Sequence, residues 1–293
     1  MCKIGIVVLN YNSYQLTVDL VQKLSAWECV YKICLVDNNS KDTFDDVAFS
    51  DKVKYIKNKE NTGYAAGNNV GLRYLVEECG CDFAFISNPD VIFEESVLVD
   101  MCRTFDKDEN IVLISTKRYG ANKAIMHQYH YFPSFKTAFF KNFLILGKLD
   151  RQETYEKQNK RVDSAEGYLV VDAVPGAFFG IRSSFLKEIG YLYEGTFLYR
   201  EEIILGRQAK ELGYKAVVIN TSTHIHDHHI AHFSNKKMYA LDRKSLMIYY
   251  KKFNLLNPIQ TALLKCAIAF GCFEYNLACD IYKYCCPIKI RIE

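Results

Sequence analysis

Continuous apolar runs alternate with segments of helical spacing through the first 115 residues of the chain. A run such as 3–9 (KIGIVVL) has almost no polar position, which is typical of a strand buried on both faces of a sheet. Strands are predicted at 3–9, 32–37, 53–58, 83–87 and 111–115. Helices are predicted around Leu16, Leu20, Val21 and Leu24, at 63–80 and at 94–105. This alternation predicts a mostly parallel α/β sheet flanked by helices.

The second half of the chain has a less regular pattern. Residues 118–168 carry aromatic and Lys residues with little clean period, which indicates a loop-rich insertion over one end of the sheet. Further elements are predicted as a strand, turn and short helix over 168–190, a helix over 201–215 ended by Gly213, and a strand over 216–219. From Met238 the pattern is helical to the end, with Pro258 as a break.

Composition narrows the class of protein. The 293 residues carry a net charge of +3 and no sustained basic stripe, so a nucleic-acid-binding protein is not expected. The first residues lack the cleavage site of a signal peptide. Eleven cysteines without zinc-like spacing are read mostly as small buried side chains in a reducing cytoplasm. No run reaches the roughly 18–20 apolar residues that a membrane-spanning helix needs.

Short polar residues follow four of the predicted strands. Ligands of open parallel sheets bind at the carboxyl ends of strands, so these positions are candidate contacts. They are Asn10, Tyr11 and Asn12 after the first strand, Asp37, Asn38, Asn39 and Ser40 after the second, Asn58, Asn61 and Gly63 after the third, and Asn88 and Asp90 after the fourth. Amides and carboxylates of this kind suit the edges of a nucleoside. Taken singly, each is also an ordinary turn residue.

Asp90 lies where a buried strand runs out, in the stretch FISNPDVIF (85–93). The chain has no GxGxxG after the first strand and no GxxxxGK[ST], which disfavours a dinucleotide enzyme and a P-loop NTPase. A diphosphate that no glycine-rich loop holds needs a cation, and a hard divalent ion prefers oxygen ligands. Asp90 can supply one such oxygen ligand.

Six segments resemble family 2 glycosyltransferases, specifically the bacterial rhamnosyltransferase-like branch with a GT-A fold. They occur in the family's order over residues 3 to about 230 as VVLNYNS, LVDNNSKD, NTGYAAGNNVGL, ISNPDV, VPGAFFGIRSSFLKEIG and FLYREEIILGRQAKELGYKAVV. The resemblance implies a catalytic domain over 1–230, with a nucleotide-binding half (1–117) and an acceptor or catalytic half (118–230). Residues 231–293 are then a helical C-terminal extension.

The resemblance also implies roles for single residues. Positions that would bind the nucleotide sugar are Asn10, Asp37, Asn39, Gly63, Asn68, Asn88, Asp90 and Gly176, the last in a loop with Pro175 and Ala177 that approaches the donor sugar. Asp90 matches the aspartate of the family's DxD element that is expected to bind Mg²⁺ or Mn²⁺, and His226 matches a downstream histidine that joins the metal. The tract HIHDHHIAH contains other histidines that could bind the metal ion instead, and Asp227 could orient an imidazole.

The motif YREE resembles the family's YGED or YDED, whose final acid is the usual base. It maps the base to Glu202, with Glu201 beside it, although acids at a helix start are also favoured for stability alone. Two departures stand out: Glu202 replaces the usual Asp, and Asn88 replaces the first Asp of DxD. Because the longer Glu202 would displace the base, Glu201 is kept as an alternative.

The implied activity is an inverting, metal-dependent transfer of a hexose to a saccharide or lipid-linked saccharide in surface polysaccharide synthesis. The branch favours dTDP-rhamnose as the donor, with UDP-linked sugars as alternatives. A sugar nucleotidyltransferase is disfavoured, because VVLNYNSYQ lacks the glycine- and arginine-rich loop of that class. A non-catalytic nucleotide-sugar-binding partner subunit of an active transferase stays open.

The tail over 258–286 carries few charges. One interpretation is a helix packed on the catalytic domain or on a second subunit, as in a homo-oligomer. The other is a helix that lies in the plane of a membrane. The second interpretation predicts a cytoplasmic protein at the inner face of the cell membrane.

Overall fold

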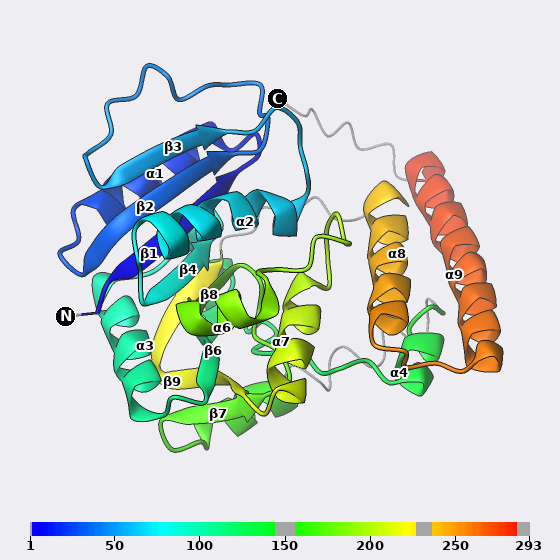
Figure 1. The fold of residues 1–293 in the computed structure, drawn as a ribbon. Helices are drawn as coiled ribbons and strands as arrows, with labels where there is room; N and C mark the ends of the chain where they lie inside the picture. The colour runs from blue at the N-terminus through cyan, green and yellow to red at the C-terminus, as the bar shows by residue number, and fades with distance from the viewer. Residues whose placement is uncertain (1, 144–155, 227–235, 286–293) are drawn as a thin grey trace. The chain divides into compact units, whose positions relative to one another are not determined.

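The computed structural model describes residues 2–143, 156–226 and 236–285 of the chain (Figure 1). The chain divides into two compact units. The first unit comprises Met1–Phe132 and Tyr155–His228 and contains the sheet. The second comprises Pro133–Thr154 and His229–Glu293 and is helical. Residues 133–143, predicted to belong with the catalytic half, therefore group with the C-terminal helices.

Four parallel strands build the first half of the sheet, in the order β3-β2-β1-β4. Each coincides closely with a predicted apolar run: β1 (Ile4–Asn10), β2 (Val30–Asp37), β3 (Val53–Lys57) and β4 (Phe83–Ser87). The strands β1 and β4 are buried almost throughout, which explains why their sequences do not alternate.

The second half of the sheet contains antiparallel pairs as well. The strand β8 (Phe178–Arg182) lies antiparallel between β4 and β6 (Ile111–Tyr119), and β9 (Lys215–His226) runs parallel to β6. Two short strands, β5 (Val91–Ile92) and β7 (Tyr168–Val171), pair antiparallel with β9. The sheet is thus parallel in its first half and mixed in its second.

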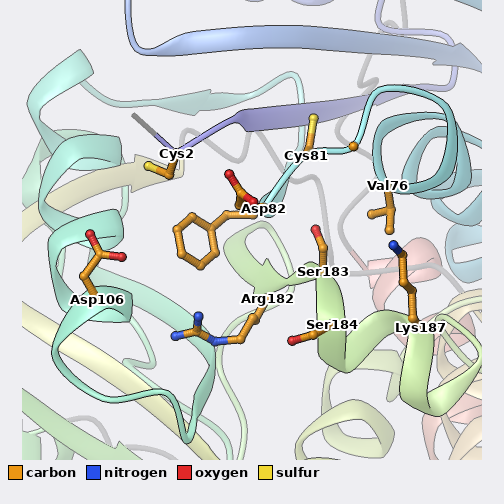
Figure 2. A pocket seen from close by; sticks show the side chains of 11 residues that line it. Cys2, Val76, Cys81, Asp82, Asp106, Arg182, Ser183, Ser184 and Lys187 are labelled. Atoms are coloured by element: carbon orange, nitrogen blue, oxygen red, sulfur yellow. The ribbon is translucent and has the colours of Figure 1, made fainter.

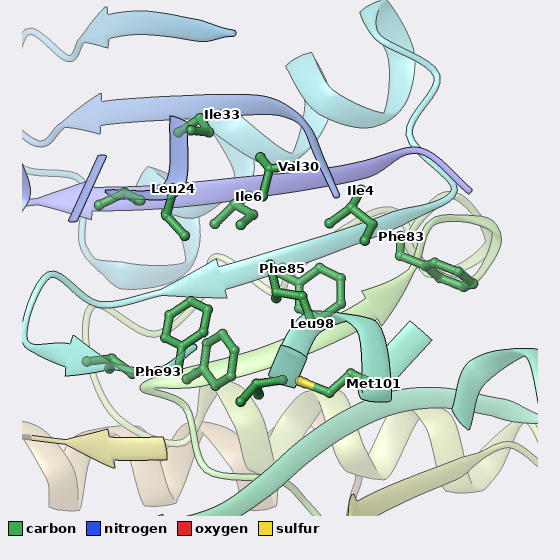
Figure 3. Close-up of a cluster of buried hydrophobic side chains, with 14 of the residues drawn as sticks. Ile4, Ile6, Leu24, Val30, Ile33, Phe83, Phe85, Phe93, Leu98 and Met101 are labelled. Carbon is green, nitrogen blue, oxygen red and sulfur yellow. The ribbon is translucent and has the colours of Figure 1, made fainter. Parts of the chain in front are cut away.

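Helices cover both faces of the sheet and enclose one apolar cluster on each. The helices α1 (Tyr14–Ser25) and α3 (Glu95–Lys107) pack on one face, where Figure 3 shows Leu24, Leu98 and Met101 near strand residues such as Phe85. The helices on the other face are α2 (Tyr64–Arg73), α6 (Ser183–Ile189) and α7 (Glu201–Glu211). Successive residues of β1 enter opposite clusters, Ile6 and Val8 the first and Val7 the second. This is the predicted three-layer arrangement.

For two elements the observed extent differs from the prediction in ways that concern the site. The helix predicted at 63–80 is α2 followed by a π-helical turn, Tyr74–Glu78. The strand predicted at 216–219 continues to His226, because β9 shifts register against β6 between Thr116 and Lys117 and then pairs on with β6 and β5. Polar residues in this extension, such as Thr221 and Ser222, hide the strand from an apolar pattern.

The helical unit contains α4 (Phe135–Phe140), α8 (Lys236–Lys252) and α9 (Pro258–Cys285). Among the described residues one helix, α9, is long and apolar enough over Pro258–Ile281 to cross a membrane by length and composition. The expectation that no segment reaches this length is therefore corrected. The charged residues Lys265 and Glu274 divide the apolar sequence of the helix into shorter runs. The average composition of the helix is nevertheless apolar.

The turn before α2 depends on a glycine. Gly63 has φ +90° and ψ −178°, a backbone conformation that only glycine adopts readily. A Cβ at this position would overlap the carbonyl oxygen of Phe197. The same carbonyl accepts a hydrogen bond from the Tyr64 N–H at 2.8 Å. The absence of a side chain thus lets the start of α2 touch the loop that leads into α7.

We expect Gly63→Ala to lower the free energy of unfolding by about 2–5 kcal/mol, from backbone strain plus steric overlap. The matched control is Gly80→Ala, since Gly80 also has positive φ but a Cβ there would meet nothing within 4 Å. That variant should lose only about 1–2 kcal/mol, the backbone part alone. Urea unfolding of both variants measures the difference, and equal losses would contradict the close contact with Phe197.

Candidate active site

The carboxyl ends of β1, β2 and β4 lie at one edge of the sheet because these strands run parallel. In the register of the sheet, Asn10 lies opposite Asp37 at the end of β1 and β2, and Val8 lies opposite Ser87 at the end of β4. The polar residues predicted as ligand contacts follow directly after these positions. The strand alignment therefore gathers them along the same edge.

Asn10 is buried, and its amide is fully used within the protein. Its Nδ2 donates to Asp37 Oδ1 at 3.0 Å and to Ser40 Oγ at 2.8 Å. Its Oδ1 accepts from the Ser13 N–H and the Thr17 hydroxyl. These four bonds fill the hydrogen-bonding capacity of an asparagine. The predicted contact of Asn10 with a nucleotide stays a prediction; in this structure its side chain holds Asp37 in place.

The turn after β2 supplies the other predicted nucleotide contacts. The buried Asp37 carboxylate also accepts from the Ser40 N–H. Asn12 and Asn39 both have left-handed backbones, with φ of 55° and 63°, which asparagine tolerates better than most residues. Both residues are exposed at this edge, and Asn12 Oδ1 accepts from the Lys41 N–H.

Asn38 joins the ends of β2 and β3, a role that sequence reasoning missed. Its Nδ2 donates to Asn61 Oδ1 at 2.9 Å and to the Gly63 carbonyl at 3.1 Å. Its Oδ1 accepts from Asn58 Nδ2 at 3.0 Å. The adjacent Asn–Asn pair in the sequence is a signal of a tight turn but does not reveal which amide points inward. Asn38 fixes the loop that presents Gly63 and α2.

Asp90 and His226 lie together. Asp90 directly precedes β5, and the antiparallel pairing of β5 with β9 places Val91 opposite His226. His226 Nε2 is 3.3 Å from Asp90 Oδ2, and both side chains are mostly buried. The pair predicted from two motifs more than a hundred residues apart is thus brought to one place. Asp227 and the histidines that follow lie outside the described residues.

Tyr64, at the start of α2, links the remaining predicted residues. Its hydroxyl donates a short hydrogen bond to the Gly176 carbonyl. Burial and the negative charges of Glu201 and Glu202 raise the pKa of Tyr64 well above its ordinary value, with a smaller contribution from Asp90. Glu202 lies close to the same loop, because a Cβ at Gly176 would come 3.5 Å from Glu202 Oε2. No sequence motif pointed to Tyr64, because a tyrosine at a helix start is not itself a chemical signal.

Two residues near Tyr64 come from the predicted sugar-binding motifs. The Asn88 N–H donates to the Ala177 carbonyl at 2.8 Å, which fixes the loop containing Gly176 against the end of β4. Asn68 is fully buried one turn after Tyr64, and its Nδ2 donates to the Tyr64 carbonyl at 2.9 Å. Its Oδ1 has no hydrogen-bond partner within the described part of the chain. A buried oxygen of this kind is costly unless a donor reaches it.

Glu201 and Glu202 open α7 after a strained turn. Tyr199 and Arg200 both have left-handed backbones, with φ of 73° and 75°, although neither is Gly or Asn. Such conformations cost on the order of 1–3 kcal/mol each and occur preferentially at functional sites. The strain sets the direction in which the two carboxyl groups leave the helix. The sequence predicted both acids but gave no signal of this turn.

The two glutamates have different surroundings. Glu201 is only 6% exposed, and burial followed by the charge of Glu202 raises its pKa to about 8. Glu201 is therefore mostly protonated at neutral pH. The Glu202 side chain is 17% exposed, and its Oε1 lies 3.6 Å from His130 Nε2. Glu202 is the more open of the two carboxyl groups.

His130 belongs to the region for which loops were predicted, yet its backbone is well anchored. It exchanges two backbone hydrogen bonds with Ala173, at 2.9 and 3.2 Å. The neighbouring residues are held by buried amides: Gln158 Nε2 donates to the Tyr129 carbonyl, and Gln128 Nε2 donates to the Arg118 carbonyl. A glutamine in an irregular stretch reads as a surface residue, which is why this support was missed.

Asp90 and His226 are the residues that could hold a metal ion. Within residues 2–143, 156–226 and 236–285, no group of three or more His, Cys, Asp or Glu side chains is arranged to bind one. The pair supplies one carboxylate and one imidazole. Two protein ligands are enough for a divalent ion whose other ligands are substrate phosphates and water. The pair therefore fits an ion that binds together with a diphosphate.

A cavity of about 510 Å³ lies at the opposite edge of the sheet, where β1 and β4 begin (Figure 2). Arg182 lines it and donates to the carbonyl oxygens of Phe105 and Ile111 at 2.7 and 3.1 Å. Asp82, also in the lining, accepts from the Lys3 N–H at 2.8 Å. These groups bind the ends of strands and helices together, so this cavity is not our candidate site.

Comparisons with known proteins identify the family of this chain. Residues 5–190 match the model of glycosyl transferase family 2. Over 200 residues the chain is 26% identical to the low-salt glycan biosynthesis hexosyltransferase Agl10 of Haloferax volcanii, a match that covers 68% of this chain and 59% of that protein. The matched part of this chain thus corresponds to about three fifths of the length of its curated relative.

Two solved structures share the fold over 97% of this chain. One is the mannosyltransferase PcManGT from Pyrobaculum calidifontis in complex with GDP-Man and Mn²⁺, with a TM-score of 0.56, 12% identity and 75% of that chain covered. The other is GalNAc-T7 with UDP, GalNAc and Mn²⁺, with a TM-score of 0.58, 13% identity and 58% covered. At such identities the likeness shows the GT-A fold alone. Because the family model matches more than half of the sequence, this chain belongs to glycosyl transferase family 2.

Proposed function

We propose that this protein is an inverting, metal-dependent hexosyltransferase that uses a nucleoside-diphosphate sugar. The observation that carries the proposal is the geometry of the loop around Gly176. Its Gly176 carbonyl accepts from the half-buried Tyr64 hydroxyl, it lies beside Glu202 Oε2, and its Ala177 carbonyl accepts from the Asn88 N–H, two residues before Asp90. Two functions meet there: a carboxylate that can take a proton, and an Asp–His pair that can hold a cation. A site that only bound a nucleotide would have no use for the first.

In the proposed reaction an acceptor hydroxyl oxygen forms a bond to the anomeric carbon of the sugar. The bond from that carbon to the diphosphate oxygen breaks, and the nucleoside diphosphate leaves with the electron pair. Glu202 takes the proton of the hydroxyl as general base. A divalent ion, when bound, would neutralise charge on the departing diphosphate. Asp90 and His226 would hold that ion.

Glu202 rather than Glu201 is proposed as the base. A general base must be ionised at the working pH, and burial keeps Glu201 mostly protonated. Glu202 is more open and lies beside the loop of Gly176, where a Cβ would come within 3.5 Å of its Oε2. His130, 3.6 Å from Glu202, is proposed as a positioning residue that limits the rotamers of the carboxylate. The contact with His130 accounts for a glutamate at the position where the family usually has an aspartate.

The proposal extends to the contacts of the nucleotide sugar, the ion, the donor and the acceptor. Asn39, Gly63 and Asn68 would contact the nucleotide sugar, and the unpartnered oxygen of Asn68 offers an acceptor for a donor group on it. The ion is proposed as Mn²⁺ in preference to Mg²⁺, because an imidazole suits the softer ion. Rhamnose carried by dTDP is retained as the donor, with a glycan or lipid-linked glycan as acceptor at the inner face of the cell membrane. The mannose and GalNAc of the two structural neighbours name other donors to test.

Substitution of the two glutamates tests which one is the base. We expect Glu202→Gln to lower kcat by about 10²–10⁴-fold, the usual contribution of a general base. Glu201→Gln should change kcat less than about tenfold, because a protonated acid and an amide are similar in shape and charge. His130→Ala should lower kcat by an intermediate factor with KM for the donor unchanged. The measurement is steady-state turnover with the donor identified by binding.

The reverse order, with Glu201→Gln the more damaging change, would move the base to Glu201. Donor binding with no turnover in the wild type, unaffected by Glu202→Gln, would favour the non-catalytic partner subunit instead. A kcat close to that of the wild type in His130→Gln, but not in His130→Ala, would support positioning through a polar contact. Loss of folding is checked by comparing the melting temperatures of all variants with that of the wild type.

The raised pKa of Glu201 makes a separate prediction on stability. The folded protein holds this proton more tightly than the unfolded chain, in which the pKa is near 4.5. Stability from this group is complete below pH 4.5 and is lost as the pH rises toward 8, by up to about 1.4 kcal/mol per pH unit. Glu201→Gln removes this loss, so the variant should gain stability relative to wild type between pH 5 and about pH 8.

Urea unfolding at several pH values measures that difference. The control is Glu211→Gln, which removes a half-exposed acid from the other end of α7 and so corrects for the loss of one negative charge. A constant difference between Glu201→Gln and wild type across the pH range would contradict the assignment.

Nucleotide binding is tested by thermal shift with dTDP, UDP, GDP and CDP, each with Mn²⁺ and with EDTA. A ligand at about 100 times its Kd stabilises the folded state by about 2.7 kcal/mol, which raises the melting temperature by about 4 °C. We expect this shift with one nucleotide, only with metal, and not in Asp90→Ala or His226→Ala. The control is Asp106→Ala, at the opposite edge of the sheet. Metal-independent binding, or equal loss in the control, would overturn the Asp–His assignment.

A further inference from the structure

The helix α9 has an exposed apolar stripe along its whole described length. Its members are 46–72% exposed: Ile259, Leu263, Phe270, Phe273, Leu277 and Ile281. At 100° per residue these six positions fall within an arc of about 80°, and they span about 33 Å of the helix axis. Large apolar side chains that are scattered singly need no explanation, but a continuous stripe does.

The opposite side of α9 is packed within the helical unit. Leu264, Ala267 and Gly271 are buried there, and a Cβ at Gly271 would overlap the Asn142 carbonyl oxygen. Tyr275 stacks on Tyr239 of α8 with ring centroids 4.1 Å apart. This side already has partners in α4 and α8, whereas the apolar side chains of the stripe are exposed.

The two units of the chain have net charges of opposite sign, which the overall net charge of +3 does not reveal. The helical unit has 14 Lys and Arg against 6 Asp and Glu, a net charge of +8. The first unit has 23 against 28, a net charge of −5. An apolar helix face within a basic unit is the combination that binds the surface of an anionic bilayer, through apolar burial and attraction to acidic headgroups.

We propose that α9 lies in the plane of an anionic membrane with this stripe in the headgroup and acyl boundary. A spanning orientation is disfavoured, because it would strip α9 of its contacts with α4 and α8. It would also carry Asp280, which pairs with Lys236 of α8, toward the hydrocarbon. A second copy of the chain is disfavoured as the partner of the stripe. It would not require a net charge of +8 on the helical unit, and that charge would oppose self-association.

Vesicle flotation with the full-length protein tests the inference. The vesicles are phosphatidylcholine alone, or phosphatidylcholine with phosphatidylglycerol, at low and high salt. The stripe variant is Leu263→Gln, Phe273→Gln and Leu277→Gln together. The control variant is Leu16→Gln, Val170→Gln and Leu212→Gln, which removes three apolar side chains of similar exposure, 48–51%, from the first unit. Vesicle binding is the readout, so the result is independent of sugar transfer.

We expect the wild type and the control variant to float with the anionic vesicles, and to be released as salt rises. The stripe variant should bind at least about tenfold more weakly while melting at the wild-type temperature. Absence of wild-type flotation, or equal flotation of the stripe variant, would overturn the proposal. So would equal binding to neutral vesicles. A stripe-dependent dimer without vesicle binding, measured by sedimentation, would assign the face to a second copy.

Discussion

Parallel pairing of β1 with both β2 and β4 is the constraint on which the candidate site depends. Strands that run the same way must end at the same edge, so the turns that follow them meet there. Asn10 then bonds to Asp37 across the two strand ends. The chain can devote short amides to holding this edge together, because the core below is supplied by two separate apolar clusters, one on each face of the sheet.

The second half of the chain completes the site by a different route. The short strand β5 pairs antiparallel with the far end of β9, and this pairing alone brings His226 to Asp90. The strained turn at Tyr199 and Arg200 brings the acids of α7 toward Tyr64. The site therefore lies between the regular first half of the sheet, which supplies the amides, and the irregular second half, which supplies the ionisable groups.

What the sequence revealed follows the same division. Apolar runs identified the buried strands β1, β2 and β4 and the helices between them, because burial on both faces leaves no alternation to misread. The motifs marked Asp90, Glu201, Glu202 and His226 by residue type. The antiparallel insertion of β8, the polar extension of β9 and the left-handed Tyr199 left no local signal, since each is set by tertiary pairing.

The direction of individual side chains was also beyond the sequence. Asn10 and Asn38 look alike in a list of polar turn residues, yet both prove to be internal braces with their amides engaged within the protein. Adjacent glutamates in one motif differ in burial, and the burial of Glu201 raises its pKa to about 8. Such differences arise from contacts between segments that lie far apart in the chain, as do the buried glutamines beside His130.

The contact between Gly63 and Phe197 has a consequence for exchanging parts between relatives. The main chain of one turn rests against the main chain of the other, and the Tyr64 N–H closes the contact. Neither segment can be reshaped without displacing its neighbour, so their energetic effects cannot be additive. A chimaera that takes the loop around Phe197 from another transferase must therefore also take the turn around Gly63 from the same protein. The two segments have to be exchanged together.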